Sequence, residues 1–333
     1  MYALIGRRLL QLPVVLLVIS ALVFFGLRLG PFDPTVVAAE ASRDPEVVET
    51  LRHEYGLDRP LVEQYGTFIS GIAHGDFGRS FISNRPVTAS ILDRIPATLE
   101  LAFASIIVGT LLGVGLGFIA AFRRDTYVDT GARVLTLLGL SIPTFWLGIV
   151  AIAIFAVGLG WLPAGGRYSV REPYEAITGF ILLDSLLQKD MDAFASAVRH
   201  LIMPALTLSA FVASLIGRIT RASIVEQSGA FYTTAALAKG ISRTRVFVRH
   251  SFRNALLPII TIVGLQFGLV LGGAVITETV FNWPGMGKFL VDAINMRDFP
   301  QIQAAIFVLA SMYVFVNLAV DILYGVADPR ARL

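Results

Sequence analysis

The stretch "YTTAALAKGISRTRVFVRHSFRNALLP", residues 232–258, is a basic segment between two apolar ones. An apolar run at residues 200–217 precedes it, and a second apolar run at residues 256–280 begins at its end. Apart from histidine, the first run has no ionisable side chain and the second has one. A helix of roughly 20 mostly apolar residues crosses a hydrocarbon core of about 30 Å. The pattern therefore predicts two membrane-spanning helices joined by a basic loop on one side of the membrane.

The composition of the whole chain agrees with a membrane location. Of 333 residues, 55% are hydrophobic and 15% are charged, and the mean hydropathy is +0.72. Soluble domains have about 25% charged residues, so the composition argues against a soluble globular protein. The chain has no cysteine, which excludes disulfides, thiolate metal sites and cysteine nucleophiles.

Six stretches are apolar and long enough to predict an all-α membrane protein with six transmembrane helices. They are residues 9–30, 98–122, 132–160, 200–217, 256–280 and 303–326. Pro143 and Pro204 fall inside the third and fourth stretches, where a proline kinks or caps a span without excluding it. The first stretch also resembles a secretory signal, but its apolar run is longer than a signal core and five more spans follow. We therefore expect a retained anchor.

The distribution of charge predicts the orientation. With the N-terminus inside, the inner pieces are residues 1–8, 123–133, 218–254 and 327–333, and the outer pieces are residues 31–97, 161–199 and 282–302. The inner pieces hold 14 Lys and Arg against four acidic residues, net +10, and the outer pieces hold 12 against 17, net −5. An excess of Lys and Arg marks the cytoplasmic side, so both termini are predicted to be cytoplasmic. Because the basic residues are spread over all inner loops, anionic lipid headgroups explain them and we expect no nucleic-acid partner.

We predict three parts along the chain: an anchor with an extracytoplasmic segment (1–97), a core of five helices (98–326) and a cytoplasmic tail (327–333). Within the first part, "DPEVVETLRHEYGL" (44–57) is typical of a short amphipathic helix, and "RPLVEQYGTFISGIAHGDFG" (59–78) predicts a second helix near the membrane surface.

No pattern indicates catalysis or a bound cofactor. The segment Gly285–Lys288 is superficially similar to a phosphate loop, but Phe289 stands where Ser or Thr would bind magnesium. Four histidines are scattered along the chain and do not cluster as metal ligands. We therefore expect no enzyme activity, no metal and no cofactor bound by this chain.

Two predicted spans carry glycines at four-residue spacing. They are Gly109, Gly113 and Gly117 in the second span and Gly264, Gly268 and Gly272 in the fifth. Such stripes let helix backbones approach closely, either as static packing or as a surface on which helices slide during gating.

The candidate pore and gating residues are Gly264, Gln266, Gly268 and Glu278. Glu278 lies near the outer end of the fifth span, where a structural pairing is the alternative to a pore-facing role. No carboxylate lies near the middle of a span, which argues against an ion-coupled carrier.

The quoted loop predicts two helices. Residues 231–239 contain good helix formers, and Gly240 is a natural C-terminal stop. Ser242 is placed to cap a second helix leading into the fifth span, on which Arg245, Arg249 and Arg253 form a basic stripe beside an apolar one of Val248, Phe252 and Leu256. Isolated helices shorter than roughly 12–15 residues are marginal in water. The first helix must therefore be held by a groove on another protein or by lipid headgroups.

"TAALAKG" (234–240) resembles the "EAA…G" cytoplasmic loop of permease subunits of bacterial ABC importers, with Thr234 in place of Glu. The longer pattern through "RNALLP", together with "HGDFGRS", "IPATLELA", "ITETVFNWPGMG" and "VNLAVDILYGVADPR", is similar to the dipeptide and oligopeptide permease branch along nearly all of the chain.

This resemblance implies the transmembrane-domain fold of type I ABC importers with a cytoplasmic coupling helix. It implies a second, homologous permease subunit, two cytoplasmic ATPase subunits that bind ATP and Mg²⁺, and an extracytoplasmic solute-binding protein. The ATPase contact would fall on Thr234, Ala235, Ala236, Lys239, Gly240 and Arg243. Thr234 departs from the family's Glu, so a salt bridge assigned to that Glu does not carry over.

The substrate implied by the resemblance is a dipeptide or oligopeptide. Relatives in the branch also carry glutathione, nickel chelates or haem, and "ITGFILLDSLL" (177–187) is more similar to the dipeptide version. The alternatives to an importer permease are an autonomous secondary transporter and a membrane scaffold with no transport role.

Overall fold

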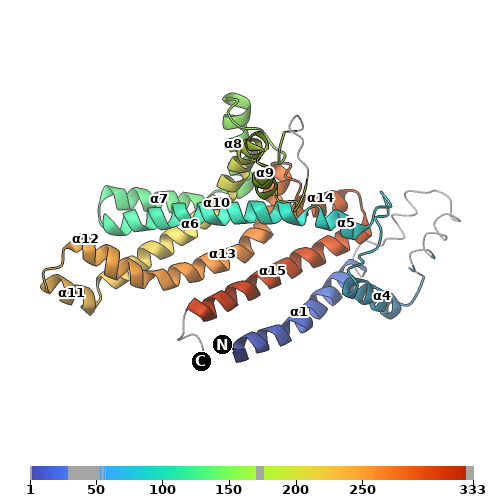
Figure 1. Cartoon of the computed structure of the whole chain (residues 1–333), viewed down its shortest axis with the longest axis horizontal. Helices are drawn as coiled ribbons and strands as arrows, with labels where there is room; N and C mark the ends of the chain where they lie inside the picture. Colours follow the sequence, from blue (N-terminus) through green and yellow to red (C-terminus); the bar gives the residue numbers. More distant parts are fainter. Residues whose placement is uncertain (1, 29–52, 54–55, 57, 170–175, 328–333) are drawn as a thin grey trace. The chain divides into compact units, whose positions relative to one another are not determined.

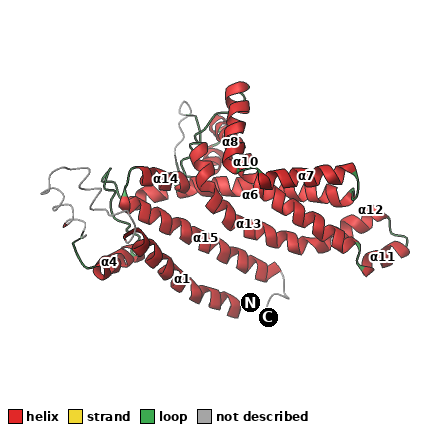
Figure 2. Ribbon diagram, turned by 180° about the vertical axis from the view of Figure 1, so that it is seen from behind, coloured by secondary structure: helices red, strands yellow, loops and turns green. Residues whose placement is uncertain are grey.

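The computed structural model describes residues 2–28, 53, 56, 58–169 and 176–327. Within these residues every named element is a helix (Figure 2). The amphipathic helix predicted at 44–57 and most of the tail 327–333 lie outside the described residues. The second helix of the outer segment is confirmed, as Leu61–Ala73.

The elements follow one another along the chain as drawn in Figure 1. They are α1 (Tyr2–Arg28), α4 (Leu61–Ala73), α5 (Val87–Leu92), α6 (Ile95–Phe122), α7 (Tyr127–Ser141), α8 (Thr144–Ala151), the π-helix η1 (Ile152–Gly158), α9 (Ile181–Gln188), α10 (Met191–Ser228), α11 (Phe231–Ala238), α12 (Arg243–Val246), the π-helix η2 (Phe247–Phe252), α13 (Arg253–Val280), α14 (Met286–Asn295) and α15 (Phe299–Ala327).

Five helical stretches of the described chain are long and apolar enough to cross a membrane, and a bent pair makes up to six. The five are Leu10–Arg28, Val87–Phe122, Met191–Ser228, Arg243–Val280 and Phe299–Val320. The bent pair is Tyr127–Ser141 with Thr144–Gly158, at an angle of 102°. Its break falls at Pro143, as the sequence predicts, because a proline lacks the N–H that would continue the helix. Pro204, in contrast, lies inside the continuous helix α10.

The chain divides into two units, which α6 and α15 both pass through. Unit 1 comprises residues 1–96 and 285–315, and unit 2 comprises residues 97–284 and 316–333. In unit 1, α5, α14 and α15 enclose an apolar core around Met286 and Phe289. The predicted division at residues 97 and 326 remains a prediction.

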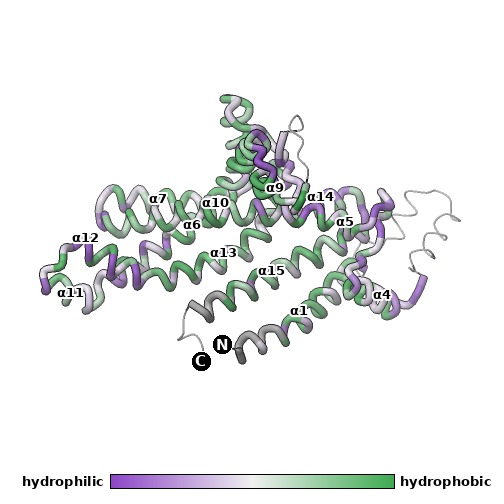
Figure 3. The backbone as a smooth tube through the Cα atoms, in the orientation of Figure 1, coloured by the Kyte–Doolittle hydropathy of each residue, from purple (hydrophilic) through white to green (hydrophobic). Residues whose placement is uncertain are grey.

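In unit 2 the glycine stripe of α6 is confirmed as a close-packing surface against α10. A Cβ atom added at Gly109 would lie 2.7 Å from the Val212 side chain, and one added at Gly117 would lie 2.5 Å from the backbone oxygen of Gly217. Real Cβ atoms do not approach so closely, so only glycine permits this separation of the two backbones. Hydropathy colouring shows the apolar length of α13 and the hydrophilic segment around α12 (Figure 3).

Candidate functional site

The short helix α11 ends at Gly240 in a complete C-terminal motif. Gly240 has φ +82°, its N–H donates to the oxygen of Leu237 at 2.9 Å, and the N–H of Ile241 donates to the oxygen of Ala236 at 3.2 Å. This pair of bonds is the Schellman arrangement, which favours glycine because a side chain is strained at positive φ. The predicted stop at Gly240 is confirmed.

One face of α11 packs against the chain itself. Thr233 and Ala236, three residues apart, are both buried, and the Thr233 hydroxyl donates to the oxygens of Ser228 and Ala230 at 2.9 and 2.5 Å. The Tyr232 hydroxyl donates to the Gln227 side chain at 2.7 Å. These contacts hold the helix against the end of α10 and account for a helix too short to be stable alone.

The other face of α11 is exposed and carries an aromatic side chain. Phe231, Thr234, Ala235 and Ala238 follow the spacing i, i+3, i+4, i+7 of one helical face, and all four are exposed. Phe231 is 96% exposed. Two of the predicted contact residues are therefore separated, since Ala235 lies on the exposed face and Ala236 on the buried one.

Phe231 was missed by the sequence analysis. The signal in the sequence was a large aromatic residue at the first position of the predicted helix, directly after Gly229 and Ala230.

The remaining predicted contact residues flank this face. Lys239 and Gly240 are exposed, and so is Arg243. Arg243 also lines a cavity of about 370 Å³ behind α11, formed by the ends of α6 and α10 with α12 and η2. The structure thus brings all six predicted residues to one loop, although their role at an ATPase remains a prediction.

The helix after Ser242 differs from its prediction in two respects. Ser242 occupies the N-cap position of α12, but its side chain makes no capping hydrogen bond. The helix then passes through the π-turn η2, so its buried residues, Val246, Ser251 and Ala255, are spaced five and four apart. Of the predicted apolar stripe, Val248 is 46% exposed. The predicted basic stripe of Arg245, Arg249 and Arg253 is exposed.

The pore candidates all lie on α13. Gln266 and Gly268 are buried, and neither polar atom of the Gln266 amide has a partner within the described residues. Glu278 is fully buried and accepts a hydrogen bond from Thr98 at 2.7 Å, so it braces α13 against the start of α6. The structure of the single chain does not test whether these residues line a pore, so their pore role remains a prediction.

The glycine stripe of α13 is not uniform. A Cβ atom added at Gly264 would lie 2.4 Å from a Val320 methyl group, whereas one at Gly272 would meet nothing within 4 Å. Within the described chain no helix packs closely against Gly272, so a close approach at this position remains a prediction.

A second polar cluster lies in unit 2 around Asp184 of α9, in the loop that the sequence analysis predicts to be extracytoplasmic. Asp184 accepts hydrogen bonds from the backbone N–H groups of Ile177, Thr178 and Gly179 and from the Thr178 hydroxyl. Burial by itself raises the pKa of Asp184, but these hydrogen bonds outweigh it and the pKa lies below its ordinary value. The ionised carboxylate thus organises the turn that enters α9.

Among solved structures, this fold is similar to an amino acid ABC transporter crystallised with histidines. The TM-score is 0.50 at 14% identity, covering 73% of this chain and 94% of that one. This likeness shows that the helical fold of the chain is similar to that of a chain of this transporter.

Sequence relatives define the family. Residues 1–102 match the family described as the N-terminal part of binding-protein-dependent transport system membrane components, and residues 113–333 match the binding-protein-dependent transport system inner membrane component family. The chain belongs to this family of inner membrane transport proteins.

Three relatives match along almost their entire length. The di/tripeptide transport system permease protein DppB of Pseudomonas aeruginosa is 42% identical, covering 100% of this chain and 99% of the relative. The dipeptide transport system permease protein DppB of Escherichia coli is 40% identical over 94% of each chain. The glutathione transport system permease protein GsiC of Escherichia coli is 39% identical, covering 98% of this chain and 97% of the relative.

Proposed function

We propose that this chain forms half of the translocation path of a dipeptide importer and transmits ATP-driven motion from a partner ATPase through α11. Peptide transport is supported by the permeases of 42% and 40% identity that are named for dipeptides or di- and tripeptides. Glutathione, itself a tripeptide, is the substrate class of the alternative relative. Nickel chelates and haem remain further alternatives.

The observation that carries the coupling role is the exposed face of α11. Phe231 projects with 96% of its surface exposed beside Thr234 and Ala235, which have small side chains. Burying a large aromatic side chain contributes about 1.5–3 kcal/mol, and small neighbours allow a partner's surface to approach the helix backbone closely. An exposed Phe231 next to the small side chains of Thr234 and Ala235 fits a cleft on a partner protein better than a layer of lipid headgroups.

The partners follow from this role. A second permease subunit completes the path, two cytoplasmic ATPase subunits bind ATP and Mg²⁺, and an extracytoplasmic binding protein delivers the peptide. This chain itself binds no cofactor and carries out no chemistry. Both termini lie in the cytoplasm, in agreement with the +10 net charge of the inner pieces.

The proposed mechanism is alternating access. Closure of the ATPase pair on ATP draws the α11 helices of the two permease subunits together and opens the path outward. Hydrolysis then resets the path inward. Because α11 is fixed to the end of α10 by Thr233, a displacement of α11 is passed directly to a membrane-spanning helix.

The coupling role is tested with the assembled transporter carrying Phe231→Asp. We expect peptide-stimulated ATP hydrolysis and peptide uptake to fall at least tenfold. This loss is expected whether the ATPase stays bound to the permease or dissociates from it. Val248→Asp is the matched control, because Val248 is an exposed apolar residue of the same loop that lies outside α11. Unchanged coupling in a correctly assembled Phe231→Asp transporter would contradict the proposal.

A second measurement separates the importer from an autonomous carrier. The purified chain alone, reconstituted in liposomes under a proton or sodium gradient, is expected to show no peptide uptake. The substrate class is checked by identifying the ligand retained by the binding protein that co-purifies with the complex. A retained ligand other than a peptide would redirect the proposal to that ligand.

A further inference from the structure

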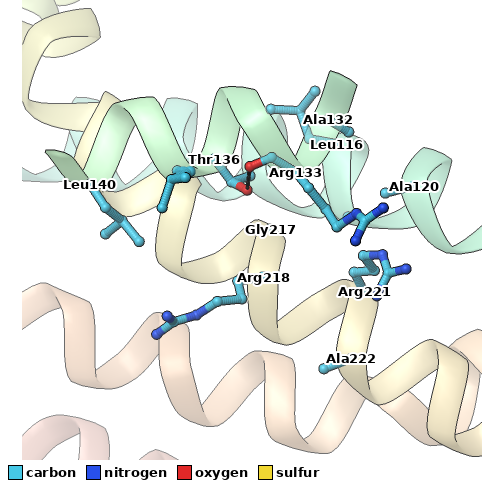
Figure 4. Close-up of a pocket in the computed structure, with 12 residues that line it drawn as sticks. Leu116, Ala120, Ala132, Arg133, Thr136, Leu140, Gly217, Arg218, Arg221 and Ala222 are labelled. Atoms are coloured by element: carbon cyan, nitrogen blue, oxygen red, sulfur yellow. Dashed lines mark hydrogen bonds between the residues drawn. The ribbon is translucent and has the colours of Figure 1, made fainter. Parts of the chain in front are cut away.

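A cavity of about 330 Å³ lies between α6, α7 and α10, away from α11. Its walls are mainly apolar and include Leu116, Leu137 and Leu140, and three arginines border it, Arg133, Arg218 and Arg221. Figure 4 shows Arg133 of α7 and Arg221 of α10 close to each other, with Arg218 at another edge of the cavity. The cavity is thus amphipathic, with guanidinium groups at its edges and apolar side chains along its walls.

The charges around the cavity do not balance. Asp129 is fully buried and accepts two hydrogen bonds from Arg221, both at 2.7 Å, while Arg133 lies 3.4 Å from the same carboxylate. One carboxylate therefore serves two guanidinium groups. Arg218 has no hydrogen-bond or ion-pair partner among the described residues. Asp125, whose charge also acts on Arg221, is itself paired with Arg124. The cluster therefore carries unmatched positive charge and suits an anion.

The position of Arg218 along α10 fixes its depth in the membrane. No Lys, Arg, Asp or Glu occurs between Arg199 and Arg218. At 1.5 Å per residue this interval of helix is about 28 Å long, close to the hydrocarbon thickness of about 30 Å. The two arginines therefore mark the two boundaries of the hydrocarbon core, and Arg218 lies at headgroup depth.

In the proposed orientation, on which this step rests, Arg218 marks the inner boundary. Helices α7 and α10 then agree in direction, because Arg133 lies nearer the inner end of α7 than Leu140 does, and Arg221 lies nearer the inner end of α10 than Gly217 does. Anionic lipids are concentrated in the cytoplasmic leaflet, and basic pockets between membrane helices on that side suit their headgroups.

We propose that this cavity binds an anionic phospholipid of the inner leaflet. The phosphate accepts hydrogen bonds from Arg218, while Arg133 and Arg221 add positive charge at the other edge of the cavity (Figure 4). An acyl chain lies along Leu137 and Leu140. A soluble anion would leave the apolar floor uncovered, whereas a phospholipid satisfies both the charge and the apolar surface. The bound lipid joins α7 to α10 at the point where the Asp129 ion pairs also join them.

The test uses the assembled transporter in nanodiscs of phosphatidylglycerol and phosphatidylcholine, followed by native mass spectrometry of the lipid retained after delipidation. We expect Arg218→Gln to lower the retained phosphatidylglycerol at least fivefold and Arg218→Lys to lower it less. Arg249→Gln is the matched control, because it removes one exposed positive charge from the same side outside the cavity. Leu140→Trp fills the apolar part without changing charge and is also expected to reduce retention.

Photoactivatable phosphatidylglycerol locates the lipid. Attachment to residues 132–140 or 217–222 in the assembled transporter supports the proposal. Equal phosphatidylglycerol retention by Arg218→Gln and Arg249→Gln would overturn the proposal. Photolabelling that avoids both segments would also overturn it, since the second permease subunit would then cover the cavity. Neither result bears on the Phe231→Asp experiment, so failure of the lipid site is distinguishable from failure of the coupling role.

Discussion

Arg167 and Glu100 form a buried ion pair that joins the segment between η1 and α9 to the first turns of α6. The Arg167 guanidinium donates two hydrogen bonds to one carboxylate oxygen of Glu100, at 2.9 and 2.6 Å. The other carboxylate oxygen accepts from the backbone N–H of Leu182, at the start of α9, at 2.9 Å. The side chains are only 6% and 7% exposed. Glu100 therefore positions the loop that precedes α10.

Removing one member of this pair is expected to destabilise the protein strongly. Arg167→Met leaves the Glu100 carboxylate buried without its partner, which costs about 3–5 kcal/mol. The double variant Arg167→Met with Glu100→Gln removes both charges and should be more stable than Arg167→Met alone. Thermal unfolding in detergent, followed by circular dichroism, measures the two single variants, Arg167→Met and Glu100→Gln, and the double variant. A double variant as unstable as the sum of the single ones would show that the two residues act independently.

Substitution of the α6 glycines is expected to separate α6 from α10. In Gly117→Ala the new methyl group would lie 2.5 Å from the Gly217 backbone oxygen, so the helices must move apart. Overpacking of this kind costs typically about 1–3 kcal/mol. Gly115→Ala is the control on the same helix, because a Cβ there meets nothing within 4 Å and alanine favours the helix. Equal melting temperatures for the two variants would contradict the packing.

The loop around Asp184 is expected to lose stability in acid. A carboxylate whose pKa is lowered on folding stabilises the folded protein above its unfolded pKa of about 3.9, and this contribution disappears as the pH falls through the lower folded value. Asp184→Asn should therefore destabilise the loop at neutral pH and show a flatter stability profile below about pH 4. Limited proteolysis between residues 161 and 190 at stepped pH measures this. Parallel profiles for the two proteins would contradict the role of the ionised side chain.

The two faces of α11 are expected to respond oppositely to a bulky charge. Ala235 is exposed, so Ala235→Arg should leave the isolated subunit as stable as wild type while abolishing peptide-stimulated ATP hydrolysis in the assembled transporter. Ala236 is 9% exposed, so Ala236→Arg should destabilise the loop before assembly. Melting temperature and ATPase activity are compared for the pair. Loss of stability in Ala235→Arg would show that this face is already covered within the subunit.

Gln266 is expected to lower the stability of the isolated subunit. Its buried amide has no partner in the described part of the chain, and an unsatisfied buried polar group costs about 1–3 kcal/mol. Gln266→Met keeps the volume and should raise the melting temperature. Uptake by the assembled transporter is measured alongside, since a loss of uptake would place the amide in the path. An unchanged melting temperature would indicate that the amide is satisfied in the purified protein.

Features that depend on short stretches were predictable from the sequence. Apolar length alone located the spans, because each span satisfies its backbone hydrogen bonds internally. The break at Pro143 and the stop at Gly240 likewise follow from the backbone preferences of single residues. The family pattern around residues 234–240 is equally local.

Features that join distant residues were not predictable. Arg167 and Glu100 are 67 positions apart, and either carboxylate or guanidinium could have faced water or another partner. The exposed face of α11 depends on Thr233 and Ala236 packing inward, and the spacing of its residues fits two opposite faces equally well. Gly117 and Gly272 belong to two stripes with the same four-residue spacing. Within the described residues a helix packs against Gly117 but none packs against Gly272. Sequence thus determined which segments are helical and span the membrane, while tertiary structure decided which faces meet, because packing depends on what lies opposite.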